Sequence, residues 1–540
     1  MPVRYALLMC TLLVMQLNAA GLFTSEKSPE PAAMSAETKT VNRILHERGR
    51  ELKLPAIPKV SDAVFLRRAC LNAAGRLPTR AETLAFLNDP SPDKRLRLID
   101  RLLDSEAHAD LIAMRFADML RIKSEFPVNL WPNAVQAFHQ KLRTDILNNR
   151  PYSEMVFEML TASGSNFRVP YANFFRGTGS RTPEGLAEIT ARTFMGLQFR
   201  KLPPDEQKKF AAFFSRIRFK STFEWKEEIV YTDPEPVRLK ACLPGSGNFT
   251  IDAPQTEPRQ VLAKALVSED NPYFARAFVN RAWSWFFGKG LIDPADDITP
   301  EPGFWTHAFR ELGLNAPSER EVQPELLEFL TDEFRRSNYN MRYLFRLIMT
   351  SDAYQAASTV PAAIRQTSEK YFLSYPVRRL EAELIVDALG DLSGQYSAYT
   401  SVIPEPFTFL PKGTRAVQLA DGSISSGTLE MFGRPARDSG AIAERNNRIS
   451  DSQRLFLLNS SLIYRQLNSL GMKIARECKW DLRRKGIEYI YLTVLSRRPT
   501  PEEVRQIMAY HDALPKKQRG RVWSELVWVL ANSKEFLYHH

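Results

Sequence analysis

The chain contains few of the residues that build redox and metal centres. Its 540 residues include seven histidines and only four cysteines, which are Cys10, Cys70, Cys242 and Cys478. These cysteines are far apart, so the sequence has no Cys-x-x-Cys pair, and it has no His-Glu-x-x-His sequence. Covalent haem attachment and the common zinc sites need such motifs. We therefore predict no metal-binding residue, no cofactor-binding residue and no cofactor.

Glycine-rich catalytic and phosphate-binding loops are missing as well. Only 24 glycines are present. The sequence contains no Gly-x-Ser-x-Gly turn, no P-loop, and no Gly-x-Gly-x-x-Gly sequence after a predicted strand. Gly288 and Gly290 come at the end of a predicted helix, where glycine commonly forms the left-handed cap. We predict no catalytic residue, and the sequence leaves open whether the chain is an enzyme.

Positive charge is in surplus but is not concentrated. The net charge of +11 is spread through most of the predicted helices. Such a surplus could favour an anionic wall polymer, a membrane surface or nucleic acid. Because no dense basic stripe is present, a soluble, mildly basic surface is the simpler interpretation, and we predict no nucleic-acid partner.

Long apolar runs are absent except near the N-terminus. Arg4 precedes a mostly apolar run at residues 5–17, and the small residues Ala19 and Ala20 follow it. A run of this length is typical of a signal peptide, because a membrane span needs ~20 residues. We expect residues 1–20 to be a signal peptide cleaved near Ala20, with an uncleaved anchor as the alternative. The mature chain would be exported to the periplasm or cell surface and would contain no transmembrane span.

The predicted fold is mainly α, with two helical domains joined by a small β-containing segment. Residues 21–55 form a polar linker and a first helix, 56–221 a helical domain, 222–256 a short β and turn connector, and 257–540 a second helical domain. Helical periodicity is clear at 272–287, 341–350 and 377–392, for example. Residues 228–231 and 248–251 read as short strands around a turn region rich in proline and glycine.

One local sequence occurs twice. Arg76, Pro78, Thr79 and Glu82 form an Arg-x-Pro-Thr-x-x-Glu sequence that starts again at Arg497. In both copies the Thr and Glu have the spacing of a capping box, in which the Thr oxygen and the Glu carboxylate bind free backbone N–H groups. Both copies are therefore predicted to be corners between two helices, and the match is a weak sign of a duplicated unit.

Several blocks in a fixed order resemble known families. In the first half these blocks are Asp62-Ala63-Val64-Phe65-Leu66-Arg67-Arg68, Gly75-Arg76-Leu77-Pro78-Thr79 and Thr190-Ala191-Arg192-Thr193-Phe194-Met195-Gly196-Leu197-Gln198. In the second half they are Asn280-Arg281-Ala282-Trp283, Arg378-Arg379-Leu380-Glu381-Ala382-Glu383 and Phe432-Gly433-Arg434-Pro435. The first half resembles the domain of unknown function 1549, also called the planctomycete cytochrome C-type 2 domain, and the second half resembles the domain of unknown function 1553. This resemblance implies a secreted two-domain protein whose reaction is not established.

The chain departs from the resembled family at its redox motif. Members typically carry Cys-x-x-Cys-His directly after the equivalent of Leu197-Gln198. Here the chain continues Phe199-Arg200-Lys201-Leu202-Pro203, with no cysteine or histidine. The sequence is thus expected to be a divergent member that lacks the family's haem motif.

Polar residues in the second half form one candidate cluster. Its members are Asn280, Arg281, Asp296, Asp297, Arg379 and Glu383. Arg379 and Glu383 are four residues apart on the predicted helix at 377–392, where such a pair can interact. The cluster could bind a ligand or supply paired carboxylates for acid–base chemistry. We favour a buried network that holds two helices together, because no positioned nucleophile accompanies it.

Aromatic residues at 283–287 and 523–528 suggest a second candidate. Exposed rings on a helix could form a carbohydrate platform, but aromatics clustered in this way more often belong to the core. We predict core positions for both groups.

Three function classes follow. The first is a non-catalytic scaffold or binding protein at the cell surface or in the periplasm, whose partner is another exported protein or a cell-surface polymer. The second is an electron-transfer component using non-covalent or partner haem, with axial ligands among His108, His139 and His307. The third is an exported hydrolase of a polymer, suggested by the carboxylate-rich helices.

Overall fold

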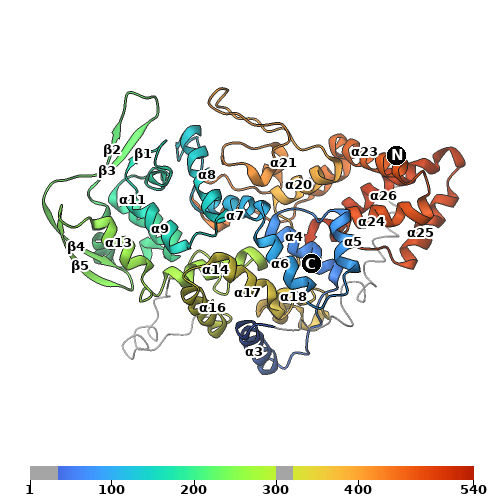
Figure 1. The fold of residues 1–540 in the computed structure, drawn as a ribbon, viewed down its shortest axis with the longest axis horizontal. Helices are drawn as coiled ribbons and strands as arrows, with labels where there is room; N and C mark the ends of the chain where they lie inside the picture. Colours follow the sequence, from blue (N-terminus) through green and yellow to red (C-terminus); the bar gives the residue numbers. More distant parts are fainter. Residues whose placement is uncertain (1–33, 300–319) are drawn as a thin grey trace.

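The computed structural model describes residues 34–299 and 320–540, and the fold is mainly α, as predicted (Figure 1). The main helices of the first half are α3 (Ala36–Glu51), α4 (Asp62–Ala74), α5 (Arg80–Asn88), α6 (Lys94–Leu103), α7 (Glu106–Met119), α8 (Pro132–Leu147), α9 (Tyr152–Thr161), α11 (Pro183–Thr190) and α12 (Pro204–Ala211). A π-helical turn, Ala191–Met195, continues α11. Among the described residues, no helix is both long enough and apolar enough to cross a bilayer.

Strands β1 to β5 form two small sheets beside the first helical part. β2 (Ile217–Ser221) and β3 (Glu228–Thr232) form a hairpin, and β1 (Gly164–Ser165) adds to it through β3. β4 (Val237–Leu243) pairs separately with β5 (Gly247–Ala253). Both predicted strands are thus present, but they belong to different sheets. The hairpin β2–β3 projects from the body of the molecule at the upper left of Figure 1.

The second half is again helical. Its elements are α13 (Pro258–Val267), α14 (Phe274–Phe287), α16 (Pro324–Arg336), α17 (Met341–Thr350), α18 (Asp352–Gln355), α19 (Ala362–Lys370), α20 (Ala382–Ser393), α21 (Gly427–Met431), α22 (Asp451–Asn459), α23 (Ser461–Glu477), α24 (Ile487–Val494), α25 (Pro501–Ala513), α26 (Val522–Ala531) and α27 (Lys534–Leu537). The two-residue strands β6 (Arg378–Arg379) and β7 (Tyr538–His539) pair antiparallel. This pairing places the end of α27 beside the start of α20.

The buried apolar side chains form two clusters, and each draws on both halves of the sequence. One cluster joins Phe116 of α7 to Phe278 of α14, whose ring centroids are 6.2 Å apart. The other joins Leu111 of α7 to Ile385 of α20. Because α7 contributes to both clusters, it lies between α14 and α20, and its polar residues face a junction of the two halves.

The repeated Arg-x-Pro-Thr-x-x-Glu sequence forms the same corner twice. Each copy connects two helices, α4 to α5 and α24 to α25, and each has a complete capping box. Arg76 donates to both carboxylate oxygens of Glu82, at 2.8 and 2.7 Å, and Arg497 donates to both of Glu503 at the same distances. The predicted capping chemistry is confirmed in both copies.

Candidate functional site

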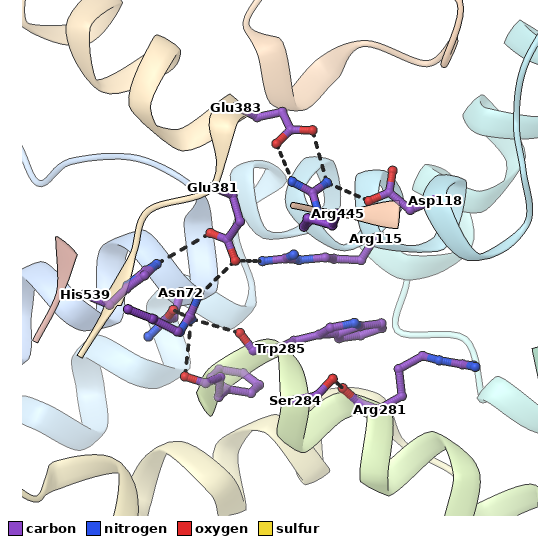
Figure 2. A network of polar contacts seen from close by, with 12 residues as sticks. Asn72, Arg115, Asp118, Arg281, Ser284, Trp285, Glu381, Glu383, Arg445 and His539 are labelled. Carbon is purple, nitrogen blue, oxygen red and sulfur yellow. Dashed lines mark hydrogen bonds and ion pairs between the residues drawn. The ribbon is translucent and has the colours of Figure 1, made fainter. Parts of the chain in front are cut away.

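An ion network lies where α7, α20 and the irregular segment after α21 meet (Figure 2). Arg445 donates from Nη1 to Glu383 Oε2 at 2.6 Å and from Nη2 to Asp118 Oδ2 at 2.6 Å. Asp118 belongs to α7, and Glu383 lies in the first turn of α20, where its side chain is fully buried. Burial opposes ionisation of Asp118 and Glu383, but Arg445 holds the pKa of each carboxyl group below the ordinary value for that residue type. Arg445 therefore connects the first half of the chain to the second as a bridging cation.

A second ion cluster adjoins the first through Glu381, the N-cap residue of α20. Glu381 Oε1 accepts from Arg115 Nη2 and from Arg378 Nη1, both at 2.9 Å. The His539 ring on β7 lies 3.5 Å from Glu381 Oε2. Burial favours the protonated acid, yet the two guanidinium groups place the pKa of Glu381 well below its usual range. Burial also lowers the pKa of His539 to about 3, so its ring is neutral at physiological pH.

Both clusters form walls of one pocket with a volume of about 210 Å³. Its charged lining residues come from α7, α14, the start of α20 and the segment 440–447, and they are Arg115, Asp118, Arg281, Arg378, Glu381, Glu444 and Arg445. Trp285 and Ser284 of α14 also line it. In the view of Figure 2, Arg115 is drawn above Trp285, and Arg281 is drawn below both. The pocket is therefore built from both halves of the chain and is rich in arginine.

Arg281 differs from the other arginines of the pocket because no carboxylate among the described residues lies within ion-pair distance of it. It donates from Nη1 to the carbonyl oxygen of Thr193 at 2.6 Å and from Nη2 to that of Arg192 at 3.2 Å. These two carbonyls belong to the π-helical turn after α11. Burial lowers the pKa of Arg281 from its ordinary value. The guanidinium is held in place by neutral groups and leaves a positive charge in the wall.

Several arginine nitrogens remain available to a ligand. Nε and Nη1 of Arg115, Nε of Arg281 and Nε of Arg445 have no hydrogen-bond partner in the described part of the chain, and they are not among its buried unsatisfied atoms. These N–H groups can therefore reach solvent through the pocket that their side chains line. Guanidinium N–H groups are well suited to binding oxyanions.

The candidate cluster expected from the sequence is divided by the structure. Arg281 lines the pocket, and Glu383 stands behind it as the partner of Arg445. Asn280 instead binds the backbone of the loop after α14, with Nδ2 donating to Ile292 O at 2.9 Å and Oδ1 accepting from Ile292 N at 2.8 Å. Asp296 accepts from the backbone N–H of Ile442, at the pocket rim.

Two further members of that cluster lie away from the pocket. Asp297 pairs with Lys201 at 2.8 Å and with Arg320 at 3.3 Å, which fixes the loop beyond α14. Arg379 donates to the carbonyl oxygen of Phe432 at 2.6 Å and to Gln453.

The expected pairing of Arg379 with Glu383 is wrong. The helix predicted at 377–392 begins only at Ala382, because Arg378 and Arg379 form strand β6. Arg379 therefore lies outside the helix, where the four-residue spacing does not bring side chains together. Glu383 pairs with Arg445 instead, across 62 residues of sequence.

The histidines named as haem-ligand candidates do not gather at the pocket. His108 Nδ1 lies 2.8 Å from the carbonyl oxygen of Ala73, and the ring packs against Phe345. His139 is buried on α8, and His307 lies outside the described residues. Neither His108 nor His139 is a pocket residue.

The aromatic groups at 283–287 and 523–528 are largely core residues, as predicted. Trp283, Phe286 and Phe287 are buried, and so are Trp523 and Trp528. Trp285 is the exception in the first group, because it is half-buried and lines the pocket.

The pocket defines a class, namely a mainly helical protein in which two sequence halves meet around an arginine-rich cavity. Residues 40–214 match the family model for a protein of unknown function (DUF1549), and residues 258–308 and 311–511 match the model for a protein of unknown function (DUF1553). The chain belongs to this DUF1549–DUF1553 family, which confirms the resemblance seen in its motifs. No curated protein and no solved structure matches the chain.

Proposed function

We propose that this chain is a non-catalytic binding protein, exported to the periplasm or cell surface, that holds the anionic group of a cell-surface polymer in the pocket between its two halves. The observation that carries this proposal is Arg281, a buried guanidinium in the pocket wall without a carboxylate within ion-pair distance among the described residues. A buried charge without a counter-ion is costly in the unliganded protein. An oxyanion in the pocket would supply the missing counter-charge.

The size of the pocket limits the ligand. Its volume of about 210 Å³ is below the ~300–1,000 Å³ typical of sites for drug-sized molecules. One acidic sugar residue, or a single carboxylate or sulfate substituent, is the suitable scale. Trp285 gives such a residue an apolar surface in the same pocket as the free N–H groups of Arg115.

The acidic side chains support binding rather than hydrolysis. A hydrolase of the carboxylate type needs one carboxyl group with a raised pKa to donate a proton. The pKa values of Asp118 and Glu381 are instead lowered by their arginine partners, although burial opposes this. Both groups therefore remain ionised near neutral pH and serve as counter-charges that orient Arg115, Arg378 and Arg445.

The test measures ligand binding by calorimetry and by the shift of the thermal unfolding temperature. We expect glucuronate, galacturonate or sulfate to raise the melting temperature, and glucose to leave it unchanged. Ser284→Leu fills the pocket without removing a charge, since the Ser284 hydroxyl only donates to the carbonyl oxygen of Arg281 at 2.6 Å. This variant should fold and lose binding.

Arg281→Gln tests the charge itself, and its matched control is Arg259→Gln. Arg259 is also a buried arginine, but it lies on α13 and pairs with Glu257 at 2.9 Å away from the pocket. We expect Arg281→Gln to weaken binding of the anion at least about tenfold, the loss of one charge-assisted hydrogen bond, and Arg259→Gln to retain it. Equal binding by the wild type and Ser284→Leu would refute the proposal.

A further inference from the structure

Three loops that are distant in sequence meet in an exposed aromatic cluster on the side of the molecule where hairpin β2–β3 projects. Trp131 comes from the loop before α8, Trp225 from the turn of the β2–β3 hairpin, and Phe407 from the irregular segment after α20. Their ring centroids are 4.6 Å apart for Trp131 and Trp225, and 5.6 Å for each of them with Phe407. The rings meet edge to face, so the three loops hold one another in position.

The same loops carry the most exposed apolar side chains in the described part of the chain. The five large apolar residues with the highest exposed fractions are Phe223 at 112%, Val402 at 84%, Phe126 at 80%, Phe409 at 67% and Trp225 at 61%. All five belong to the loops 123–131, 221–228 and 400–412, and we call these loops the apolar tip. Single exposed apolar residues are normal, but such a concentration marks an interaction site.

Cations accompany the apolar tip. Lys226 lies with Nζ at 5.6 Å from the Trp131 centroid and at 5.7 Å from that of Trp225. Lys412 is exposed on the tip and Lys220 is exposed in the adjoining strand β2, and none of these three lysines has an ion-pair partner among the described residues. Their ammonium groups are free to interact with an anionic surface.

Two acidic residues at the hairpin turn, Glu227 and Glu228, have arginine partners within the protein. Glu227 is buried, accepts hydrogen bonds from Ser165 and Thr222, and has Arg168 at 3.8 Å as its ion-pair partner. Glu228 pairs with Arg176 and Arg181. On the tip Glu224 and Glu405 are exposed and Glu125 is half-buried, against the exposed Lys226 and Lys412 there and the exposed Lys220 in the adjoining strand β2.

We propose that the apolar tip binds a lipid membrane, with Phe223, Trp225 and Phe409 entering the interface between headgroups and acyl chains. The tip is convex: Phe223, which is 112% exposed, lies in the turn of hairpin β2–β3, and this hairpin projects from the body of the molecule (Figure 1), whereas sites for small ligands are concave. Exposed Phe and Trp beside Lys is the composition of segments that lie in the membrane interface. The net charge of +11 complements the negative charge of anionic lipids.

The first test measures insertion by fluorescence. Vesicles of phosphatidylcholine and phosphatidylglycerol with brominated acyl chains quench tryptophans that enter the bilayer. Residues 1–33 contain no tryptophan, so the predicted leader cannot produce this signal in the full-length chain. We expect quenching in the wild type, a loss of most of it in Trp225→Phe, and no change in Trp480→Phe. Trp480 is a matched control because it is 51% exposed and lies outside the apolar tip.

The second test measures the strength of binding by vesicle flotation. We expect Phe223→Ser and Phe409→Ser each to lower the partition coefficient about tenfold, which corresponds to losing the burial of one Phe side chain. Leu455→Ser is the control, since Leu455 is 57% exposed on α22. Wild-type fluorescence that brominated lipid leaves unquenched would overturn the proposal. The proposal would also be overturned if Trp225→Phe were quenched as strongly as the wild type. A third contrary result would be binding to an insoluble polysaccharide that requires Trp225, with no quenching by vesicles.

Discussion

Replacing Arg445 by methionine removes the cation that connects the two halves of the chain. Methionine approximates the volume of the aliphatic part of the side chain but cannot donate to Glu383 or Asp118. Glu383 would keep only Arg434, whose Nε lies 3.6 Å away, whereas Asp118 would keep Arg437 at 2.8 Å. Most of the loss therefore falls on Glu383, which is fully buried.

The expected loss of unfolding free energy is about 3–5 kcal/mol, the cost of leaving a buried charge without its partner. The assay is urea unfolding followed by tryptophan fluorescence and circular dichroism at pH 7. Arg97→Met is the control, because Arg97 is 55% exposed and pairs with Asp89 at the surface. Such a surface pair contributes only ~0–1 kcal/mol. The double variant with Glu383→Met should recover much of the loss, since it removes the uncompensated charge.

The pH dependence gives an independent check. The pKa values of Glu383 and Asp118 are lower in the folded protein than their ordinary values of 4.5 and 3.8. Their ion pairs with Arg445 thus stabilise the fold above those ordinary values, and the contribution is lost as the pH falls through the lowered folded pKa values. The deficit of Arg445→Met should be largest at neutral pH and should shrink below about pH 4. A deficit under about 1 kcal/mol at pH 7, or one that grows in acid, would refute the reasoning.

Three shorter predictions follow from local geometry. Gly433→Ala should lower the unfolding free energy by about 3 kcal/mol or more, measured by urea unfolding, because a Cβ at φ +86° would lie 1.9 Å from the carbonyl oxygen of Asn446. Urea unfolding should show that Arg497→Ala lowers the unfolding free energy by about 3–5 kcal/mol and Arg76→Ala by about 1 kcal/mol. The reason is burial: the Arg497 side chain is 6% exposed and binds a second carboxylate, whereas that of Arg76 is 25% exposed. A chromogenic disulfide reagent should modify Cys70 only after unfolding, because burial raises the pKa of its thiol to about 12.

Elements that depend on local sequence could be predicted well. The periodicity at 341–350 coincides with α17, Met341–Thr350, and the Thr79 capping box forms as its spacing indicates. The helix predicted from 377 begins at Ala382 because β6 pairs with residues at the far end of the sequence. Long-range pairing of this kind overrides local periodicity, and the sequence around position 378 contains no sign of it.

The pocket could be predicted only in part, for a similar reason. The block containing Arg378, Glu381 and Glu383 is conspicuous in the sequence, and Arg281 was a member of the expected cluster. Arg115 and Arg445 were not, because their partners are distant: Arg115 binds Glu381 across 266 residues of sequence. No spacing rule connects charged residues so far apart. Only the packing of α7 against both apolar clusters brings them together.

The segment after Gln198, where the resemblance led us to expect a haem motif, is tied to this pocket through one loop. Lys201 pairs with Asp297, and the backbone N–H of Gln198 donates to Thr299 Oγ1 at 2.7 Å. In the same loop Asp296 accepts from the backbone N–H of Ile442, which lines the pocket. The residues after Gln198 thus make charge-paired and hydrogen-bonded contacts with the loop beyond α14. Because the same loop binds Ile442 through Asp296, these contacts help to position the rim of the arginine-rich pocket.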